Sequence, residues 1–117
     1  MRERIRDKER LVHILEAIDS LMEGRKRYSV EQAEKDDIIF YGFVKKVEII
    51  GEATYKLTKE FRDSHPEVEW DVIEGMRHVL VHGYFEITPS KVWRVIENDL
   101  PVLRPQIERF IAEESKE

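Results

Sequence analysis

The chain has 117 residues, of which 38% are charged, and its formal net charge is −5. This length suits one domain, residues 1–117, with a real core but no deep enclosed pocket, which favours an active site between subunits. The absence of cysteine excludes disulfides, thiolate metal sites and thiol catalysis. The acidic charge argues against nucleic-acid binding over a broad surface, although it does not exclude a local basic groove.

Two targeting features are absent from the sequence. No apolar run approaches the ~20 residues that span a bilayer. The first ten residues, MRERIRDKER, have none of the apolar stretch of a signal peptide. We therefore expect a cytoplasmic protein with no membrane partner.

Apolar residues recur with helical spacing from the start of the chain, and no convincing two-residue alternation is present. The first predicted helix runs from about Glu3 to Met22 and ends at Gly24. Its apolar stripe is broad: Leu11, Ile14, Leu15, Ile18, Leu21 and Met22. Ser29 and Gln32 then form a capping-box pattern, which predicts a short helical segment.

A second long helix is predicted from about Asp37 to Arg62. Its apolar positions alternate steps of three and four: Phe40, Phe43, Val47, Ile50, Thr54, Leu57 and Phe61. Such a heptad seam predicts lengthwise packing against neighbouring helices. Gly51 lies inside this helix, where glycine costs ~1 kcal/mol relative to alanine. We expect a close approach of another helix as the compensation, and His65-Pro66 as the chain break that follows.

A third helix is predicted from about Glu69 to His82, with Gly83 as a natural C-terminal stop. Thr88 and Pro89 are typical of an N-cap followed by proline at the first helical position. The residues beyond keep the same three-four rhythm: Trp93, Ile96, Leu100, Leu103, Ile107 and Phe110.

This rhythm survives Pro101 and Pro105, so we interpret the C-terminal part as one kinked helix or two collinear helices in one register. The polar tail from Ala112 to Glu117 is expected to fray. Four to five helices with short connections favour an all-α antiparallel bundle. Wide apolar stripes and leftover aromatics such as Tyr41 and Phe85 favour a homodimer.

Residues 74–84, EGMRHVLVHGY, are the most informative stretch of the chain. Arg77, His82 and Tyr84 place a cation, an imidazole and a phenol within eight residues, in the pattern R-x-x-x-x-H-x-Y. This set suits a phosphodiester substrate. On an ideal helix Arg77 and Tyr84 share a face, whereas His82 lies ~140° from Arg77. The three converge only if the helix ends near Gly83 or a partner subunit supplies some of them.

Several separated motifs accompany these residues in order. IIGEA at 49–53 and Trp70 precede the pattern, and Trp93 and DLP at 99–101 follow it. This succession closely resembles the HepT-like family, the minimal HEPN-domain proteins of bacterial and archaeal toxin–antitoxin pairs. The resemblance covers nearly the whole chain, most strongly residues 47–107.

The resemblance implies an all-α HEPN bundle that dimerises, with two copies of the motif facing one shared cleft. It implies a metal-independent endoribonuclease that needs no cofactor and cleaves transfer RNA or messenger RNA. The cognate partner in such pairs is a small MntA-like nucleotidyltransferase antitoxin. That partner transfers AMP from ATP onto a tyrosine at or near the motif and so silences the toxin.

By position, the resemblance makes Arg77, His82 and Tyr84 the catalytic residues. Imidazole moves protons near neutral pH, and the planar guanidinium binds phosphate. Tyr84 would hydrogen-bond the phosphate or stack on a base, and it is the candidate AMP acceptor because no tyrosine lies between Arg77 and His82. His78 stands where the family often has asparagine. Glu52 either supports Arg77 by an ion pair or is a solvated glutamate.

Each of these residues also has a purely structural interpretation. Arg77 could form a surface salt bridge, His82 could favour the dipole at a helix C-terminus, and Tyr84 could be a packing residue. Glu74, His78 and His82 are spaced by four and could instead bind a transition metal. The family chemistry uses no metal, so we expect none here.

The remaining histidines, His13 and His65, have no partner pattern and are expected to be incidental. The N-terminal basic run is interleaved with acidic residues, so it is a solvated face or it steers RNA: Arg2, Arg4, Arg6, Lys8 and Arg10. Three further lysines are expected to be solvated: Lys45, Lys46 and Lys56.

A different class of function is also compatible with the chain. Related HEPN proteins are non-catalytic substrate-binding partners of nucleotidyltransferases. The acidic net charge favours this alternative, and the intact motif argues against it. No feature of the sequence favours a third alternative, a purely structural helical dimer.

Overall fold

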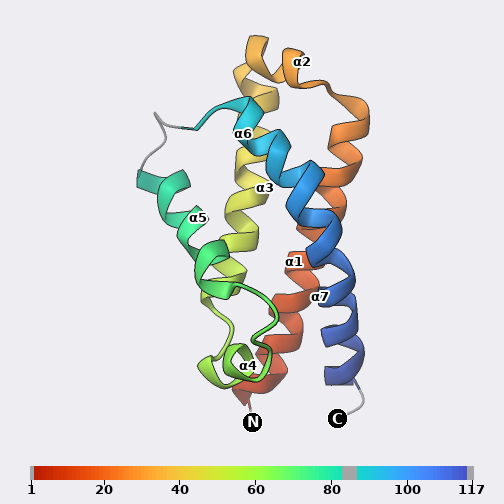
Figure 1. Ribbon diagram of the computed structural model, residues 1–117, viewed down its shortest axis with the longest axis vertical. Helices are drawn as coiled ribbons and strands as arrows, with labels where there is room; N and C mark the ends of the chain where they lie inside the picture. Colours follow the sequence, from red (N-terminus) through yellow and green to blue (C-terminus); the bar gives the residue numbers. More distant parts are fainter. Residues whose placement is uncertain (1, 83–86, 116–117) are drawn as a thin grey trace.

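The computed structural model describes residues 2–82 and 87–115, without the side chains of residues 2–5, 81 and 82. These residues form helices and no strand, which confirms the predicted all-α bundle. The bundle is elongated, and α1 begins at the end of it where α7 finishes (Figure 1). The elements in chain order are α1 (Arg2–Arg27), α2 (Val30–Lys35), α3 (Asp37–Tyr55), α4 (Lys59–Ser64), α5 (Trp70–His82), α6 (Pro89–Arg94), the π-helical segment η2 (Val95–Asp99) and α7 (Leu100–Ser115).

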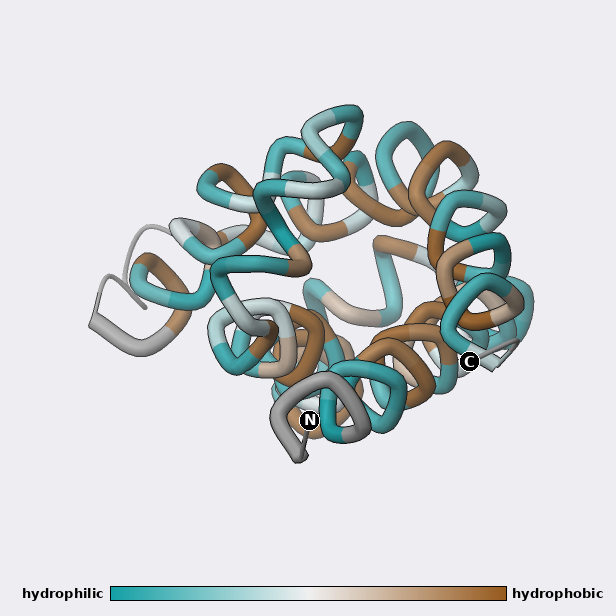
Figure 2. The backbone as a smooth tube through the Cα atoms, turned by 90° about the horizontal axis from the view of Figure 1, so that it is seen from below, coloured by the Kyte–Doolittle hydropathy of each residue, from teal (hydrophilic) through white to brown (hydrophobic). Residues whose placement is uncertain are grey.

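The hydrophobic core lies along the long helices. α3 packs against both α1 and α5, and α1 also packs against α7 (Figure 1). Apolar parts of the backbone trace turn mostly toward the interior of the bundle (Figure 2). The largest fully buried apolar side chains come from α1, α3, η2 and α7: Leu11, Ile14, Ile18, Leu21, Ile50, Ile96, Leu100, Ile107 and Phe110. None of the described helices combines the length and the apolar character that a membrane span requires.

The second long helix is shorter than the sequence predicts. α3 ends at Tyr55 and the separate helix α4 follows, so the prediction of one helix to Arg62 is wrong. Thr58 explains the break, because its hydroxyl caps α4 by accepting a hydrogen bond from the Phe61 amide at 3.1 Å. The predicted heptad seam is nevertheless buried along its whole length, including Leu57 between the two helices.

A buried carboxylate holds this break in place. Asp7 on α1 is fully buried. It accepts one hydrogen bond from the Thr58 backbone N–H at 2.8 Å and one from the Thr58 hydroxyl at 2.7 Å. A buried charge is tolerated only where hydrogen bonds replace its hydration. The pair therefore ties the first turns of α1 to the start of α4.

The first helix is longer than the sequence predicts. Gly24 does not end it, because α1 continues to Arg27. A Cβ atom at position 24 would lie 3.0 Å from Cζ of Phe43, which is tighter than an ordinary van der Waals contact. Gly24 therefore makes room for the Phe43 ring, which packs in turn against Trp93 with the ring centroids 4.3 Å apart.

Two of the other predicted helix boundaries are confirmed and one is wrong. Ser29 and Gln32 form the capping box of α2, and Thr88 caps α6 by accepting a hydrogen bond from a backbone amide. The tail, however, is helical beyond Ala112, where fraying is predicted, as far as Ser115.

The two C-terminal prolines lie in one continuous helical run, α6–η2–α7, as the apolar rhythm predicts. The π-helical segment ends two residues before Pro101, and the Leu100 amide donates to the Val95 carbonyl across it. Proline lacks an amide hydrogen, and its ring clashes with the carbonyl one turn earlier. The wider turn of a π-helix relieves this clash without breaking the run.

A close crossing joins α3 to α5 at Gly51, which confirms the predicted close approach there. A Cβ atom at this position would lie 2.6 Å from Cβ of Arg77, and 3.3 Å from its Cα and backbone nitrogen. The absence of a side chain lets the two helices approach. The crossing therefore depends on glycine at this position and determines where Arg77 lies.

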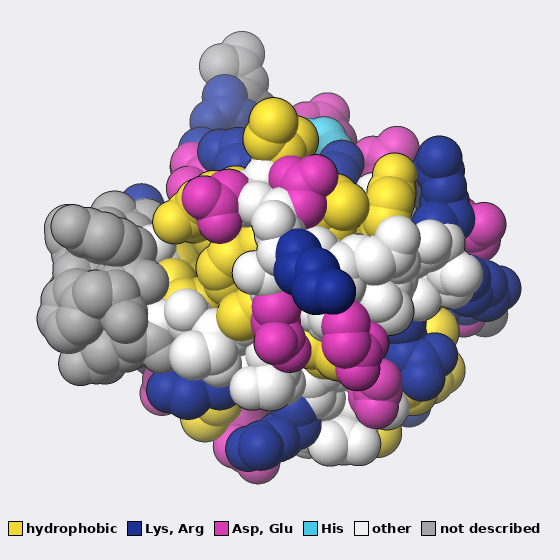
Figure 3. All heavy atoms as spheres, turned by 90° about the horizontal axis from the view of Figure 1, so that it is seen from above, with side chains coloured by type: hydrophobic (Ala, Val, Ile, Leu, Met, Phe, Trp, Pro, Cys, Tyr) yellow, Lys and Arg dark blue, Asp and Glu magenta, His cyan; other side chains and the backbone are white. Residues whose placement is uncertain are grey.

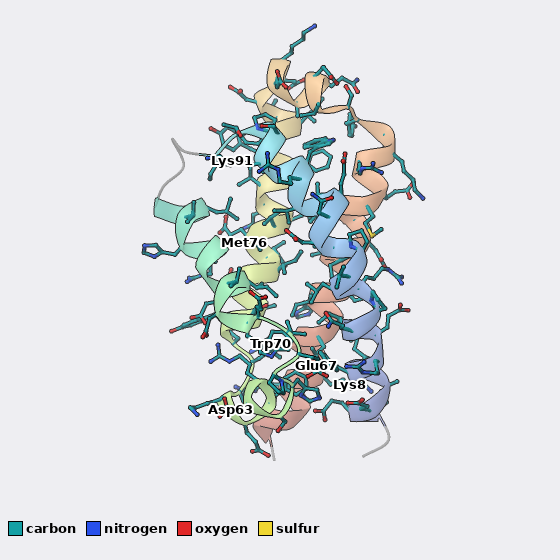
Figure 4. All side chains as sticks on the ribbon, viewed as in Figure 1. Lys8, Asp63, Glu67, Trp70, Met76 and Lys91 are labelled. Carbon is teal, nitrogen blue, oxygen red and sulfur yellow. The ribbon has the colours of Figure 1, made fainter. Side chains whose placement is uncertain are left out.

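We predict that Asp7→Ala lowers the free energy of unfolding by about 3 kcal/mol, because it leaves the Thr58 amide without its buried acceptor. Asp63→Ala is the matched control, because Asp63 pairs with Lys59 on the surface, where its side chain is 63% exposed (Figure 4). The control should change stability by less than ~0.5 kcal/mol. Urea unfolding followed by circular dichroism measures both. Equal losses in the two variants would contradict the structural role of Asp7.

We predict that Gly51→Ala destabilises the protein, although alanine is the better helix former by ~1 kcal/mol. The new methyl group would overlap Cβ of Arg77, an atom next to the backbone that cannot swing aside, so overpacking of about 1–3 kcal/mol outweighs that gain. Gly42→Ala in the same helix is the control, because no atom lies within 4 Å of its added Cβ. Thermal unfolding should show a loss at position 51 and a gain at position 42.

Candidate functional site

α5 carries the described part of the motif, and contacts at its N-terminal half set its position. The Trp70 side chain is buried, and its indole N–H donates to the His65 carbonyl at 2.9 Å. Arg62 on α4 donates to the Glu74 carboxylate at 3.0 Å. Together with the crossing at Arg77, these contacts hold α5 against α3 and α4.

Arg77 is half-buried between α5 and α3. Its Cζ atom lies 5.3 Å from the centroid of the Tyr55 ring, in a cation–π contact. Among the described residues, no carboxylate forms an ion pair with it. The ring holds the face of the guanidinium, so the N–H donors around its edge remain for a planar or tetrahedral anion such as phosphate.

In the structure, Glu52 does not support Arg77 by the ion pair that was predicted as one alternative. The Glu52 carboxylate lies 3.7 Å from Lys56 Nζ, and Arg77 rests on Tyr55 instead. Sequence reasoning missed Tyr55. It follows Gly51 by four residues, about one helical turn, so both lie on the face of α3 that meets Arg77. That spacing is the signal that could have identified it.

The other two motif residues lie at the limit of what the structure describes. α5 is described as far as His82, but the His82 side chain and all of Tyr84 lie outside the described residues. The convergence of Arg77, His82 and Tyr84 therefore stays a prediction. The structure contributes the position of Arg77 and the helix that leads from it to His82.

The alternative metal site of Glu74, His78 and His82 lies only partly within the described residues. Glu74 pairs with Arg62, and His78 is exposed on α5. No group of three histidine, aspartate or glutamate side chains among the described residues is arranged to hold a metal ion. The His82 side chain lies outside the described residues, so the combination of Glu74, His78 and His82 stays an alternative prediction.

The remaining histidines have different surroundings. The His65 ring stacks on Phe61 with centroids 4.2 Å apart, and its Nδ1 lies 2.9 Å from the Phe61 carbonyl oxygen. These contacts give His65 a structural role. His13 is exposed beside a shallow hollow between α1 and α3. The three lysines that were predicted to be solvated are all exposed: Lys45, Lys46 and Lys56.

An apolar groove runs along α5 on a different side from Arg77, where the helix faces α6 and η2. Its volume is about 370 Å³, and Met76 and Lys91 line it from α5 and α6 (Figure 4). Val72 and Val79, which also line it, are 58% and 45% exposed. Tyr41, one of the aromatics expected to be left over, is 55% exposed on α3, and Phe85 lies outside the described residues. Exposed apolar surface of this kind is typical of partner contacts.

Charges of both signs are mixed on the surface. From the end of the bundle that carries α2, basic and acidic side chains are interspersed over the described part of the face (Figure 3). Many pair along or between helices, as Arg104 does with Asp19 at 2.6 Å and with Glu108 at 2.7 Å. The described part of that face therefore offers no broad basic surface.

Comparison with known proteins gives a consistent result. Residues 14–110 match the model of the family described as "Ribonuclease HepT-like". A protein of Caldanaerobacter subterraneus subsp. tengcongensis named "Putative RNase" is 39% identical over 104 residues, which cover 89% of this chain and 93% of that protein. No solved structure matches significantly.

Two archaeal proteins are similar over nearly the same span. A "Putative RNase" of Methanocaldococcus jannaschii is 31% identical over 98 residues, which cover 84% of this chain and 90% of that protein. A "Probable ribonuclease HepT" of Thermococcus cleftensis is 30% identical over 103 residues, which cover 88% of this chain and 94% of that protein. The family match and the relatives confirm the resemblance to the HepT-like family. The chain belongs to the HepT-like ribonuclease family, the minimal HEPN proteins.

Proposed function

We propose that this protein is a metal-independent endoribonuclease that cleaves transfer RNA or messenger RNA. The observation that carries the proposal is the environment of the Arg77 guanidinium. The crossing at Gly51 places it, the Tyr55 ring holds its face, and no described carboxylate neutralises it. A half-buried, prepositioned guanidinium of this kind suits a phosphodiester. The names of the relatives, which refer to ribonucleases, support the same activity.

The chemistry requires a group that moves protons and a cation that stabilises negative charge. The 2′-hydroxyl of the substrate attacks the adjacent phosphorus, its proton passes to His82, and the bond from phosphorus to the 5′-oxygen breaks. The leaving 5′-oxygen takes a proton from water, and the other strand end keeps a 2′,3′-cyclic phosphate. Arg77 stabilises the charge that builds on the phosphoryl oxygens, and Tyr84 hydrogen-bonds the phosphate or stacks on a neighbouring base.

The active form that we propose is a homodimer in which two motifs face a shared cleft. A chain of this size has no deep enclosed pocket of its own for RNA. The exposed valines of α5 and the apolar groove beside them are suitable for a contact between subunits.

We further propose that the protein is the toxin of a toxin–antitoxin pair. Its partner would be an MntA-like nucleotidyltransferase that uses ATP to modify Tyr84. The phenol oxygen attacks the α-phosphorus of ATP, pyrophosphate leaves, and AMP remains on the tyrosine. The added phosphate would compete with RNA for Arg77 through its negative charge, and its bulk would fill the cleft.

A second candidate function is a non-catalytic module that binds a nucleotidyltransferase. The groove along α5, with the exposed Val72 and Val79, favours it, because such a surface suits a protein partner. A stable complex with the transferase that His82→Ala leaves intact, together with no RNA cleavage, would support this function.

We predict that the purified protein cleaves total transfer RNA in the presence of EDTA. His82→Ala should lower the rate by about 100- to 10,000-fold, because it removes the group that moves protons. Arg77→Gln should lower it by about 100-fold or more, because it removes the charge that stabilises the transition state. Arg94→Gln is the matched control, since Arg94 is exposed on α6, and its rate should stay within about twofold of wild type. Gel electrophoresis of labelled RNA measures these rates.

The outcomes separate the two functions. Cleavage that disappears in His82→Ala but persists in Arg94→Gln establishes the nuclease. The absence of cleavage by an unmodified wild-type chain, with its mass verified, contradicts the nuclease and favours the binding module. A wild-type mass that is increased by whole AMP groups identifies the silenced form, and the assay is then repeated on protein expressed without the transferase.

A further inference from the structure

A second polar site lies on the face of α3 that is turned toward α1. It is a hollow of about 210 Å³ that is lined by α1, α3 and the turn after α3, with no residue from the motif helix α5. Ile49 and Ala53 are its apolar residues, and its charged or polar residues come from both helices and the turn after α3: Arg10, His13, Glu52 and Lys56. Two permanent cations and an imidazole thus face one carboxylate in a small space.

Arg10 is the distinctive residue of this hollow. Its Nε atom is buried and has no hydrogen-bond partner among the described residues. None of the described carboxylates forms an ion pair with Arg10. A buried N–H donor of a charged group without an acceptor is unfavourable, so buried donors in native proteins normally have a partner. Because Arg10 lines the hollow and has no described carboxylate partner, its guanidinium is available to an anion that binds there.

The hollow and Arg77 lie on different sides of the same turn of α3. Gly51 and Tyr55 contact Arg77, whereas Glu52 and Lys56 line the hollow. α3 packs between α1 and α5 (Figure 1), and a helix with its side chains is about 10–12 Å wide. A ligand with several phosphates along a chain can therefore reach both positions, whereas a single phosphate cannot.

We propose that this hollow is a phosphate-binding subsite that holds the RNA strand beside the motif. Arg10 and Lys56 would bind a phosphodiester, and a ribose or base would rest on Ile49 and Ala53. Lys56 can leave Glu52 at little energetic expense, because their side chains are 51% and 43% exposed and 3.7 Å apart. This proposal rests on the proposed ribonuclease function and deepens it, since it assigns substrate-binding residues outside the motif.

The test compares three variants that each remove one positive charge: Arg10→Gln, Lys56→Gln and Lys8→Gln. Lys8 is the matched control, because it is exposed and lies on α1 roughly 160° around the helix from Arg10 (Figure 4). Binding of a fluorescent single-stranded RNA is measured by anisotropy in a His82→Ala background at several salt concentrations. Cleavage kinetics are measured with the same substitutions in the otherwise wild-type chain.

We expect Arg10→Gln and Lys56→Gln to weaken RNA binding by about fivefold or more. Each should also reduce the slope of log K against log salt by ~0.7, the value for one lost phosphate contact on a single strand. In the cleaving protein KM should rise while kcat stays within about twofold, because the reacting phosphate is not at this subsite. Lys8→Gln should leave the salt slope unchanged and the affinity within about twofold.

Three results would overturn the proposal. If wild type cleaves RNA but all three variants bind it equally, the ribonuclease function stands and the subsite does not. If wild type neither binds nor cleaves RNA, both fail together. If free AMP binds in a way that Arg10→Gln abolishes, while RNA binding is unaffected, the hollow is a mononucleotide site. Lys56→Gln, at an exposed position, keeps the test valid if Arg10→Gln impairs folding.

Discussion

The contact between Gly51 of α3 and Arg77 of α5 is the constraint on which the candidate site depends. Any side chain at position 51 would occupy space that Cβ of Arg77 already fills. The same crossing brings the Tyr55 ring, one turn further along α3, under the guanidinium. One missing side chain thus determines the spacing of two helices and the environment of the cation that binds phosphate in the proposed mechanism.

A second constraint acts at the end of α3. Asp7 and Thr58 form a buried pair that joins α1 to the cap of α4. The turn between Tyr55 and Thr58 is therefore tied to α1, and Lys56 in that turn faces the hollow beside Arg10. The buried pair and the glycine crossing together set the relative positions of α1, α3 and α5, which carry the proposed contacts to RNA.

The two sides of α5 differ in chemical character, which suits two kinds of partner. One side places Arg77 against α3, close to the hollow with Arg10, and offers cations to an anionic strand. The other side exposes Val72 and Val79 at an apolar groove and suits a protein surface. Under the proposed function, an acidic protein would bind RNA through local cations: Arg77 and Arg10 have no described carboxylate partner, and both lie beside the same turn of α3.

The sequence by itself determined the helical class, the buried seam from Phe40 to Phe61 and the close approach at Gly51, because apolar spacing and glycine are local signals of packing. The succession of motifs in the sequence also indicated the family. Only the tertiary structure decided that Gly24 makes room for Phe43, that Thr58 divides a helix, and that Tyr55 lies under Arg77. These features depend on residues far apart in the chain, such as the Asp7 carboxylate that accepts from Thr58. Local periodicity carries no information about such partners, so the surroundings of Arg77 and the hollow beside α3 followed only from the packing of the helices.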